Sequence, residues 1–268
     1  YIKILKKCIR IYKTYLIKKR ELRMVSHYDL AIIGAGIAGL SCAYHLGKKY
    51  PHLKVFICEK ERQGAGASGR NAGFVTPGSV LHFHKLQERF GKDTAWEIWR
   101  FSEANHRLLR EEIIGCRGEN CEYLQEGSIT LGRNEEDLEH LKSVADVMLE
   151  GGIRVDLVDS TQGLEGFSGG IRVLEDGQLN PVLLLKEMLH RIRLVSSHIE
   201  ISEGSRLLTV DEEEGGLRLH IEGKEDLSAK KLIYASNAYT GDILDCMQGK
   251  IMPKRGQILA TEALPFSL

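Results

Sequence analysis

An α/β fold is predicted by three features of this 268-residue sequence. Short apolar runs of strand length are interspersed with longer stretches of helical periodicity. A glycine-rich turn joins the first apolar run to the first helical stretch, and an acidic residue follows the second run. With 43% apolar residues, the chain can bury one large core or two smaller ones. We therefore expect a Rossmann-like nucleotide-binding domain and a partial α+β domain of mixed sheet and helices.

The composition excludes several classes of protein. The 37 basic and 37 acidic side chains balance, whereas a dedicated nucleic-acid binder usually has a strong basic excess. The longest uncharged stretch, residues 30–47, contains several glycines and His45, so it is a poor candidate for a transmembrane segment. The six cysteines lack C-x-x-C spacing, so we expect neither a bound metal nor a disulfide framework. This composition is typical of a cytoplasmic globular protein.

The zero net charge conceals a basic N-terminus. Residues 1–23 contain nine basic side chains and one acidic side chain, a net charge of +8, which leaves −8 for residues 24–268. An interfacial helix, a transit peptide or a nucleic-acid-binding arm would each have such a composition. Because the chain begins with Tyr1 and Met24 lies four residues before the first expected strand, we favour an extension outside the fold.

The first folded unit expected from the sequence is a βαβ unit. Residues 28–33 form a short apolar run typical of a buried parallel strand, and Gly34-Ala-Gly-Ile-Ala-Gly39 follows directly. Residues 38–49 have the apolar spacing of a helix, and residues 54–58 form a second apolar run that ends at Glu59. The whole pattern takes about 30 residues, which is the length of a βαβ unit.

Each residue of this pattern has a role in binding a dinucleotide. Gly34 permits a tight turn, Gly36 lets the backbone approach a pyrophosphate, and Gly39 lets the helix pack closely on the strand. The helix N-terminus favours the negative phosphates through its amides and its dipole. Glu59 follows Gly39 by 20 residues, the distance at which a carboxylate accepts hydrogen bonds from the adenosine ribose. The sequence therefore predicts a dinucleotide site.

The segment after the second strand bears on which dinucleotide is bound. A nicotinamide-binding domain would usually continue into a crossover helix, but residues 64–74 contain four glycines, three alanines and no acidic residue. Such a segment can run close beside a flat ligand. Its amides, Ser68 and Arg70 can contact a negatively charged or hydrogen-bonding ligand edge. The alternative is a flexible surface loop.

Together, these segments resemble the FAD-dependent amine and amino-acid oxidase family, which includes D-amino-acid oxidase, glycine oxidase and sarcosine oxidase. The resemblance rests on Ile32-Ile-Gly-Ala-Gly-Ile-Ala-Gly-Leu40, Glu59-Lys60 and Gly66-Ala-Ser-Gly-Arg-Asn-Ala-Gly-Phe74. The sequence of the last segment is most similar to that of the γ-glutamylputrescine oxidoreductase branch. Three later segments, in family order, also agree: Asp176-Gly-Gln-Leu-Asn-Pro181, Lys231-Leu-Ile-Tyr-Ala-Ser-Asn-Ala-Tyr-Thr240 and Pro253-Lys-Arg-Gly-Gln257.

The resemblance implies that FAD is the cofactor and a small amine or amino acid the substrate. Hydride would pass from the carbon beside the amine to the flavin, the imine would hydrolyse, and O2 or another acceptor would reoxidise the flavin. It places Phe74 near the flavin ring and the main chain of Arg206 against the adenine, and it indicates no general base. The expected cofactor-binding residues are Gly34, Gly36, Ile37, Ala38, Gly39, Glu59, Lys60, Ala67, Ser68, Arg70, Asn71, Ala72, Gly73, Phe74, Arg206 and Asn237.

The expected domain organisation follows from the same resemblance. We expect a discontinuous FAD-binding domain over residues 24–80 and 159–245, and an incomplete substrate domain over residues 81–158 and 246–268. Within the latter, residues 81–114 have the pattern of two amphipathic helices broken at Gly91, with Trp96 and Trp99 as core residues. Further helices are expected over residues 135–150 and from Asn180-Pro181, where Asn is a favoured N-cap. The last strands are short, and residues 211–216 have the composition of a hairpin turn with solvated charges.

One departure from the family leaves alternatives open. The sequence ends at Leu268, whereas family members continue with further substrate-domain strands and a glycine-rich segment facing the flavin pyrimidine. We therefore expect most of the ADP-binding half to form but the flavin ring to be held poorly. An NAD(P)-dependent dehydrogenase is a second hypothesis, because Lys60 and Arg62 could suit a 2′-phosphate, although Glu59 would repel it. A non-catalytic nucleotide-binding remnant is a third.

Overall fold

The computed structural model of the protein divides the chain into two compact units. The described residues are 26–79, 81–115, 118–158, 166–254, 256–258 and 262. The first unit takes its described residues from 26–66 and 192–256, and the second takes them from 67–191 and 257–262. The basic extension expected over residues 1–23 lies outside the described residues. Among the described residues, no helix is both long and apolar enough to cross a bilayer.

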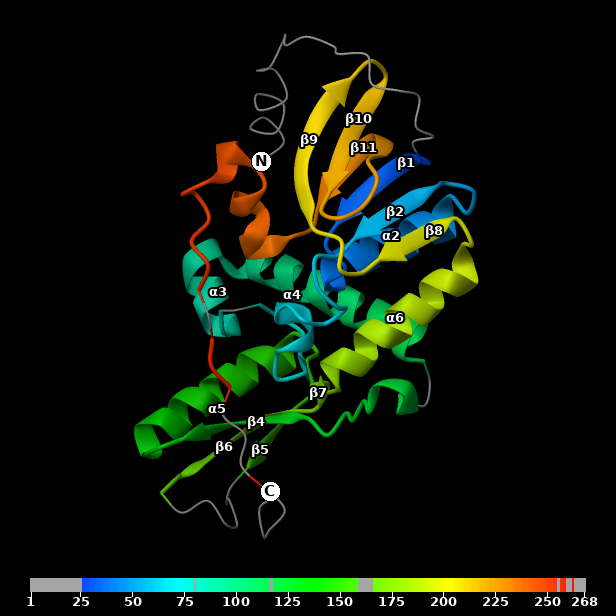
Figure 1. Ribbon diagram of the computed structural model, residues 1–268. Helices are drawn as coiled ribbons and strands as arrows, with labels where there is room; N and C mark the ends of the chain where they lie inside the picture. The colour runs from blue at the N-terminus through cyan, green and yellow to red at the C-terminus, as the bar shows by residue number, and fades with distance from the viewer. Residues whose placement is uncertain are drawn as a thin grey trace. The chain divides into compact units, whose positions relative to one another are not determined.

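The first unit is built on one six-stranded sheet with the order β8-β2-β1-β11-β10-β9, drawn from blue to orange in Figure 1. Its strands are β1 (Ser26–Ile33), β2 (Val55–Cys58), β8 (Ile199–Ser202), β9 (Leu207–Glu213), β10 (Gly216–Ile221) and β11 (Leu227–Tyr234). The first four strands in the spatial order pair in parallel, with Ile33 opposite both Cys58 and Tyr234. The carboxyl ends of these four strands therefore share one edge, where ligands of such sheets bind.

Helix α2 (Ile37–Lys49) follows β1 and packs closely against its own βαβ unit. Leu40 is fully buried, and a Cβ atom on Gly47 would lie 2.9 Å from Cδ1 of Ile199 in β8. The other side of the sheet has a continuous apolar core that includes Ala31, Phe56 and Leu219. Two short 3-10 helices, η4 (Asn237–Asp242) and η5 (Asp245–Met247), follow β11. The expected βαβ unit is thus present with its predicted order.

The second unit combines helices with small antiparallel sheets. Its helical segments are η1 (Ala67–Gly69), α3 (Phe83–Phe90), α4 (Lys92–Leu109), the π-helical turn η2 (Arg110–Ile114), η3 (Glu119–Cys121) and α5 (Glu135–Glu150). Its strands are β3 (Phe74–Val75), β4 (Ser128–Gly132), β5 (Val155–Val158), β6 (Gly169–Val173) and β7 (Gly177–Gln178). They form a three-stranded sheet β4-β6-β5 and a pair β3-β7. Helix α5 has the predicted bounds.

The two tryptophans are core residues of the second unit, as predicted. Trp99 is buried, and its ring meets the ring of Phe83 edge-on at a centroid distance of 5.6 Å. Trp96 is partly buried against the same core and lies 4.4 Å from the Phe83 ring. A Cβ atom on Gly151 would lie 1.6 Å from the Trp96 ring, so a residue without a side chain is needed where α5 ends.

Helix α6 (Pro181–Val195) begins in the second unit and ends in the first. Its predicted N-cap is present, because Oδ1 of Asn180 accepts hydrogen bonds from the backbone N–H groups of Val182 and Leu183. The division into units places residues 67–79 and 166–191 in the second unit, whereas we assigned them to the FAD-binding domain. Compactness is a different criterion from cofactor contact, so the functional division stays a prediction.

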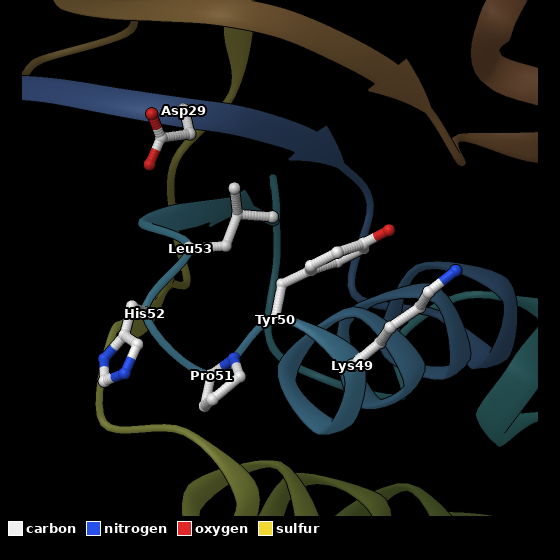
Figure 2. Close-up of a pocket in the computed structure, with 6 residues that line it drawn as sticks. All are labelled: Asp29, Lys49, Tyr50, Pro51, His52 and Leu53. Atoms are coloured by element: carbon white, nitrogen blue, oxygen red, sulfur yellow. The ribbon is translucent and has the colours of Figure 1, made fainter.

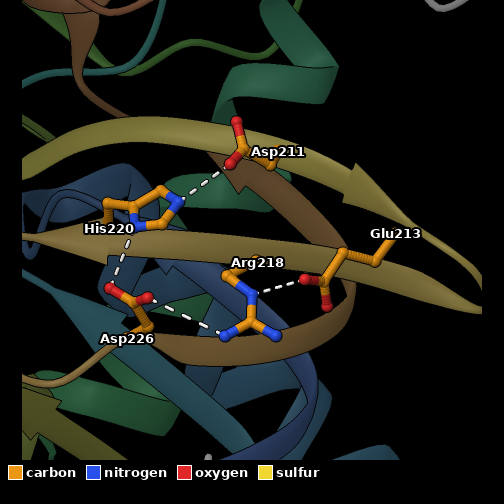
Figure 3. Close-up of polar contacts among 5 residues, drawn as sticks. All are labelled: Asp211, Glu213, Arg218, His220 and Asp226. Carbon is orange, nitrogen blue, oxygen red and sulfur yellow. Dashed lines mark hydrogen bonds and ion pairs between the residues drawn. The ribbon is translucent and has the colours of Figure 1, made fainter. Parts of the chain in front are cut away.

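The charges expected to be solvated over residues 211–216 are exposed, as predicted, but Asp211 and Glu213 also have partners. Strand β9 continues to Glu213, so the turn is shorter than predicted. His220 lies between two carboxylates, with Nε2 3.0 Å from Asp211 and Nδ1 2.9 Å from Asp226, and Arg218 pairs with Glu213 (Figure 3). These two pairings were not predicted, because cross-strand partners are set by the register of β10, which the local sequence of the turn does not reveal.

Candidate functional site: a dinucleotide crevice

The glycine turn after β1 needs glycine at two positions for two different reasons. Gly34 has a φ of +109°, and a Cβ atom there would lie 2.7 Å from the carbonyl oxygen of Ala235. Gly39 lies in the first turn of α2, where a Cβ atom would lie 2.0 Å from the carbonyl oxygen of Gly34. The first glycine therefore permits the turn, and the second permits the close packing of α2 on it.

The N-terminus of α2 begins at a glycine. The N-cap, Gly36, is extended and makes no side-chain capping hydrogen bond. Its first turn contains no acidic residue, and both Ile37 and Ala38 are exposed. The partial positive charge of the helix N-terminus is thus available to an anion such as a phosphate.

Glu59, directly after β2, is held with its carboxylate toward the glycine turn. Its Oε2 atom accepts a hydrogen bond of 2.9 Å from the backbone N–H of Ala35, and its Oε1 atom accepts one of 3.0 Å from the N–H of Glu61. Each carboxylate oxygen has a further lone pair. The side chain is therefore oriented in advance and can still accept hydrogen bonds from a ribose diol.

The loop after β8 holds the main chain of Glu59. The N–H of Glu59 donates to the carbonyl of Ser202, and its carbonyl accepts from the N–H of Ser205 at 2.7 Å. Ser205 is fully buried, and its carbonyl accepts a hydrogen bond from Sγ of Cys58. Burial, as the largest cause, raises the pKa of the Cys58 thiol to about 12, so the thiol stays protonated and can donate. This support for Glu59 connects residues 147 positions apart, which no local signal indicates.

Arg206 and Asn237 lie next to two of the strand ends that form the same edge. Arg206 is exposed, and its carbonyl accepts a hydrogen bond from the N–H of Glu222. Asn237 begins the short helix after β11 with a φ of +49°, a conformation that Asn tolerates better than most residues. Its carbonyl accepts a hydrogen bond from the hydroxyl of Thr240 at 2.7 Å.

The parallel register collects the first group of predicted residues at this edge. The glycine turn follows β1, Glu59 and Lys60 follow β2, Arg206 follows β8, and Asn237 follows β11. One residue there was not among the predicted site residues, although it belongs to the segment 231–240: Tyr239, whose ring centroid lies 3.4 Å from Nζ of Lys60. An aromatic residue after a strand carries no specific signal, so only the structure identifies this contact.

The remaining predicted residues belong to the second unit. Asn71 braces the segment locally: its Nδ2 donates to the carbonyls of Ala67 and Ser68, and its Oδ1 accepts from the N–H of Gly73. A Cβ atom on Gly73 would lie 2.0 Å from the carbonyl of Leu179, next to the β3-β7 pairing. The segment is thus an ordered turn, which disfavours the flexible-loop alternative. Its exposed predicted residues are Ala67, Arg70, Asn71, Ala72 and Phe74.

The Asp-Gly element before α6 also supports this turn. Asp176 is buried, and its Oδ2 accepts a hydrogen bond of 2.5 Å from the hydroxyl of Ser128. Burial is the largest cause that raises the pKa of this carboxyl group. Gly177 pairs with Val75 in the β3-β7 ladder, so the element fixes one side of the strand that contains Phe74.

A surface pocket lies at the opposite end of the same βαβ unit. It has a volume of about 440 Å³ and is lined by Asp29 and residues 49–53 (Figure 2). Asp29 is near the start of β1, and Lys49 is the last residue of α2, so this pocket lies away from the glycine turn. It is not the predicted dinucleotide site. Among the described residues there is also no cluster of metal-ligating side chains.

An α/β protein with a glycine turn, an open helix N-terminus and an acid at the next strand end belongs to the class of dinucleotide-binding proteins. Comparison with known proteins specifies the family. Residues 29–268 match the FAD-dependent oxidoreductase family, so the chain belongs to that family, whose cofactor is FAD.

Individual relatives agree with this assignment. The chain is 28% identical over 255 residues to a probable oxidoreductase, OrdL, from Haemophilus influenzae, covering 91% of this chain and 57% of the relative. It is 26% identical over 247 residues to γ-glutamylputrescine oxidoreductase from Escherichia coli, covering 90% and 56%. Glycine oxidase from Geobacillus kaustophilus has the same fold, with a TM-score of 0.61, 22% identity, and coverage of 81% of this chain and 57% of that one. The chain thus spans little more than half the length of these relatives.

The residues of the first unit fit the adenosine diphosphate part of FAD. The exposed N-terminus of α2 suits a pyrophosphate, and the glycine turn leaves room for its close approach. Glu59 keeps acceptor capacity for the ribose hydroxyls. Of the residues in the second unit that the sequence places at the flavin ring, Arg70 and Phe74 are exposed, Phe74 by 75%.

Proposed function

We propose that this protein oxidises the C–N bond of a small amine or amino acid by hydride transfer to FAD, after which the imine is hydrolysed. The observation that carries the proposal is the crevice of the first unit, where the glycine turn that begins α2 lies beside a carboxylate already oriented by two backbone N–H groups. The choice of an amine is supported by the similarity to γ-glutamylputrescine oxidoreductase.

In this proposal the chain's own residues bind and orient the cofactor and the substrate. Glu59 accepts hydrogen bonds from the adenosine ribose, and the amides at the start of α2 bind the pyrophosphate. Arg70 and the amides of residues 66–73 contact the ring edge, while Phe74 excludes water from the substrate side. Bound FAD supplies the hydride acceptor, and O2 or a second acceptor removes the electrons. We assign no general base, and we place the protein in the cytoplasm.

The purified chain, loaded with FAD and freed of excess cofactor, tests this proposal by its visible spectrum. Flavin bands at about 370 and 450 nm are expected to remain with the protein. Under anaerobic conditions, small amines and amino acids are then added one by one, with the corresponding 2-hydroxy acids as controls. Bleaching of the 450 nm band by an amine, with aldehyde or keto acid and ammonia as products, is the expected result.

Three results would change the conclusion. A folded protein that takes up no FAD would contradict the proposed site, and protection from heat by NAD or NADP instead would favour a nicotinamide-dependent dehydrogenase. Bleaching by 2-hydroxy acids alone would move the substrate class from amines to alcohols. Uptake of FAD without bleaching by any of these compounds would indicate that the chain binds the nucleotide without turnover.

A further inference from the structure

Two side chains outside the glycine turn meet across the end of β1. Nζ of Lys60 lies 3.4 Å from the centroid of the Tyr239 ring, well within the range of a cation–π interaction. Lys60 follows β2, and Tyr239 lies in η4 after β11. Because β2 and β11 flank β1 on its two sides, this contact spans the strand from which the glycine turn leaves.

Backbone hydrogen bonds fix the two anchors of this contact. The N–H of Gly34 donates to the carbonyl of Cys58 at 2.7 Å, and the N–H of Ala235 donates to the carbonyl of Ile33 at 2.8 Å. The segments that carry Lys60 and Tyr239 are therefore tied to the end of β1. The contact between the two side chains joins segments whose backbones are already held in place.

The contact is not needed to hold the sheet together. The ladders between β1 and its two neighbours already fix the three strands. Lys60 also has a carboxylate neighbour, Glu61, but that ion pair is longer, at 3.8 Å. Both members of the cation–π pair are partly exposed, the Lys60 side chain by 38% and Tyr239 by 43%, so each can swing away from the other without unfolding the edge.

We propose that Lys60 and Tyr239 form a latch across the dinucleotide crevice. The latch opens for FAD to enter or leave, and it is closed in both the FAD-free and the FAD-bound protein. The proposal rests on the FAD site proposed above. A latch closed with and without the cofactor slows association and dissociation together, so it sets the rate of exchange more than the affinity. An ordinary contact to the cofactor would slow only dissociation.

The test measures both rate constants for FAD with the whole chain. Quenching of flavin fluorescence in stopped flow gives association, and displacement of bound FAD by excess flavin analogue gives dissociation. For Tyr239→Leu, both rate constants are expected to rise about two- to fivefold, the Boltzmann factor of an exposed cation–π contact, with the Kd changed less than twofold. Tyr239→Phe keeps the ring and is expected to remain within twofold of wild type.

A matched control exists at the other end of α2. Lys49 lies over the ring of Tyr50 with its Nζ 5.2 Å from the centroid, so Tyr50→Leu removes a second lysine–tyrosine contact at the C-terminal end of α2. This variant is expected to leave both rate constants unchanged. Lys60→Met keeps the length of the side chain without its charge, and it provides a second way to open the latch should Tyr239→Leu fail to fold. Because Lys60 is itself an expected cofactor-binding residue, only the association rate constant of this variant is compared.

The outcomes separate the latch from the site itself. Failure of the folded wild-type protein to bind FAD would overturn the proposed site, and the latch with it. Binding by wild type with rates unmoved in Tyr239→Leu and Lys60→Met would overturn the latch alone. Faster dissociation at an unchanged association rate would also overturn it, and would make Lys60 or Tyr239 a direct contact. Equal, non-additive increases of the association rate constant in the two single variants and their double variant are the expected result.

Discussion

The two ends of the first βαβ unit differ in how their charges are satisfied. At the amino end of β1, Asp29 accepts hydrogen bonds from Nζ of Lys230 and the N–H of Lys54, and the Lys230 hydrogen bond is the main reason its pKa lies below the usual value. Lys48 and Lys49 lie at the C-terminus of α2, where cations complement the helix dipole. At the other end, the N-cap Gly36 makes no side-chain capping hydrogen bond, and the first turn of α2 contains no acidic residue. The pocket of Figure 2 lies at the amino end of β1, whereas the predicted ligand site lies at the carboxyl end.

This difference bears on where a charged ligand binds. A helix start without a side-chain cap is not enough to mark a ligand site, because α3 has none either. At the start of α2, the preceding glycine turn and the neighbouring Glu59 carboxylate add the features typical of a dinucleotide site.

The largest effect is expected when the oriented carboxylate is removed. Glu59→Ala should weaken FAD binding about 10- to 150-fold, or roughly 1.5–3 kcal/mol, because charge-assisted hydrogen bonds to the ribose are lost. Titration of the apoprotein with FAD, followed by fluorescence quenching, measures this change. Asp29→Ala at the opposite end is the matched control and should leave the affinity within twofold. Equal effects of Glu59→Ala and Asp29→Ala on the affinity for FAD would contradict the difference between the two ends.

A loss of stability is expected when a methyl group is added where α2 packs closely on the glycine turn. In Gly39→Ala the new methyl group would lie 2.0 Å from a backbone carbonyl, so α2 must move, and the free energy of unfolding should fall by about 1–3 kcal/mol. Gly47→Ala on the same helix meets side-chain atoms of Ile199 and Val195 instead, and these can yield. Urea denaturation of the two variants should therefore show a much smaller loss for Gly47→Ala. The reverse order would remove the packing role of Gly39.

A negative charge added to the first turn of α2 should have opposite effects on the stability of the apoprotein and on its affinity for FAD. Ala38→Glu adds an acid to the first turn of α2, which should stabilise the apoprotein by about 0.3–1 kcal/mol through the helix dipole. The same carboxylate should weaken FAD binding about fivefold, because it repels the phosphates. Thermal melts and FAD titration measure the two effects, and Ala38→Gln is the uncharged control. Tight FAD binding by Ala38→Glu would place the pyrophosphate elsewhere.

Local signals explain which parts of this molecule the sequence could predict. The bounds of α5 and the N-cap of α6 follow from periodicity and capping residues, and the glycine turn follows from its strand, helix and acid. The pairing of Phe74–Val75 with Gly177–Gln178 could not be predicted, because strands of two residues have no period. The contact of Lys60 with Tyr239 and the support of Glu59 by Ser205 depend on sheet order, which local sequence does not specify.

The smallest effect is expected at the β9–β10 hairpin, where every charge of the network in Figure 3 is paired, as at the amino end of β1. Burial would lower the pKa of His220, but its hydrogen bonds to Asp211 and Asp226 outweigh burial and raise it. Arg218, 3.8 Å from Asp226, also pairs with Glu213 and completes the network drawn in Figure 3.

Because the folded-state pKa of His220 is raised, its charged form stabilises the hairpin fully below the unfolded pKa of about 6.5, and this contribution is lost as pH rises through the folded-state pKa. His220→Gln should therefore cost less than about 1 kcal/mol at pH 6, as expected for partly exposed pairs, and progressively less at higher pH. Urea denaturation of wild type and variant between pH 6 and pH 9 measures the difference. A difference independent of pH would mean that the imidazole stays neutral between its two carboxylates. Since the network is complete without a ligand, the affinity for FAD should be the same in both proteins, in contrast to the Ala38→Glu pair.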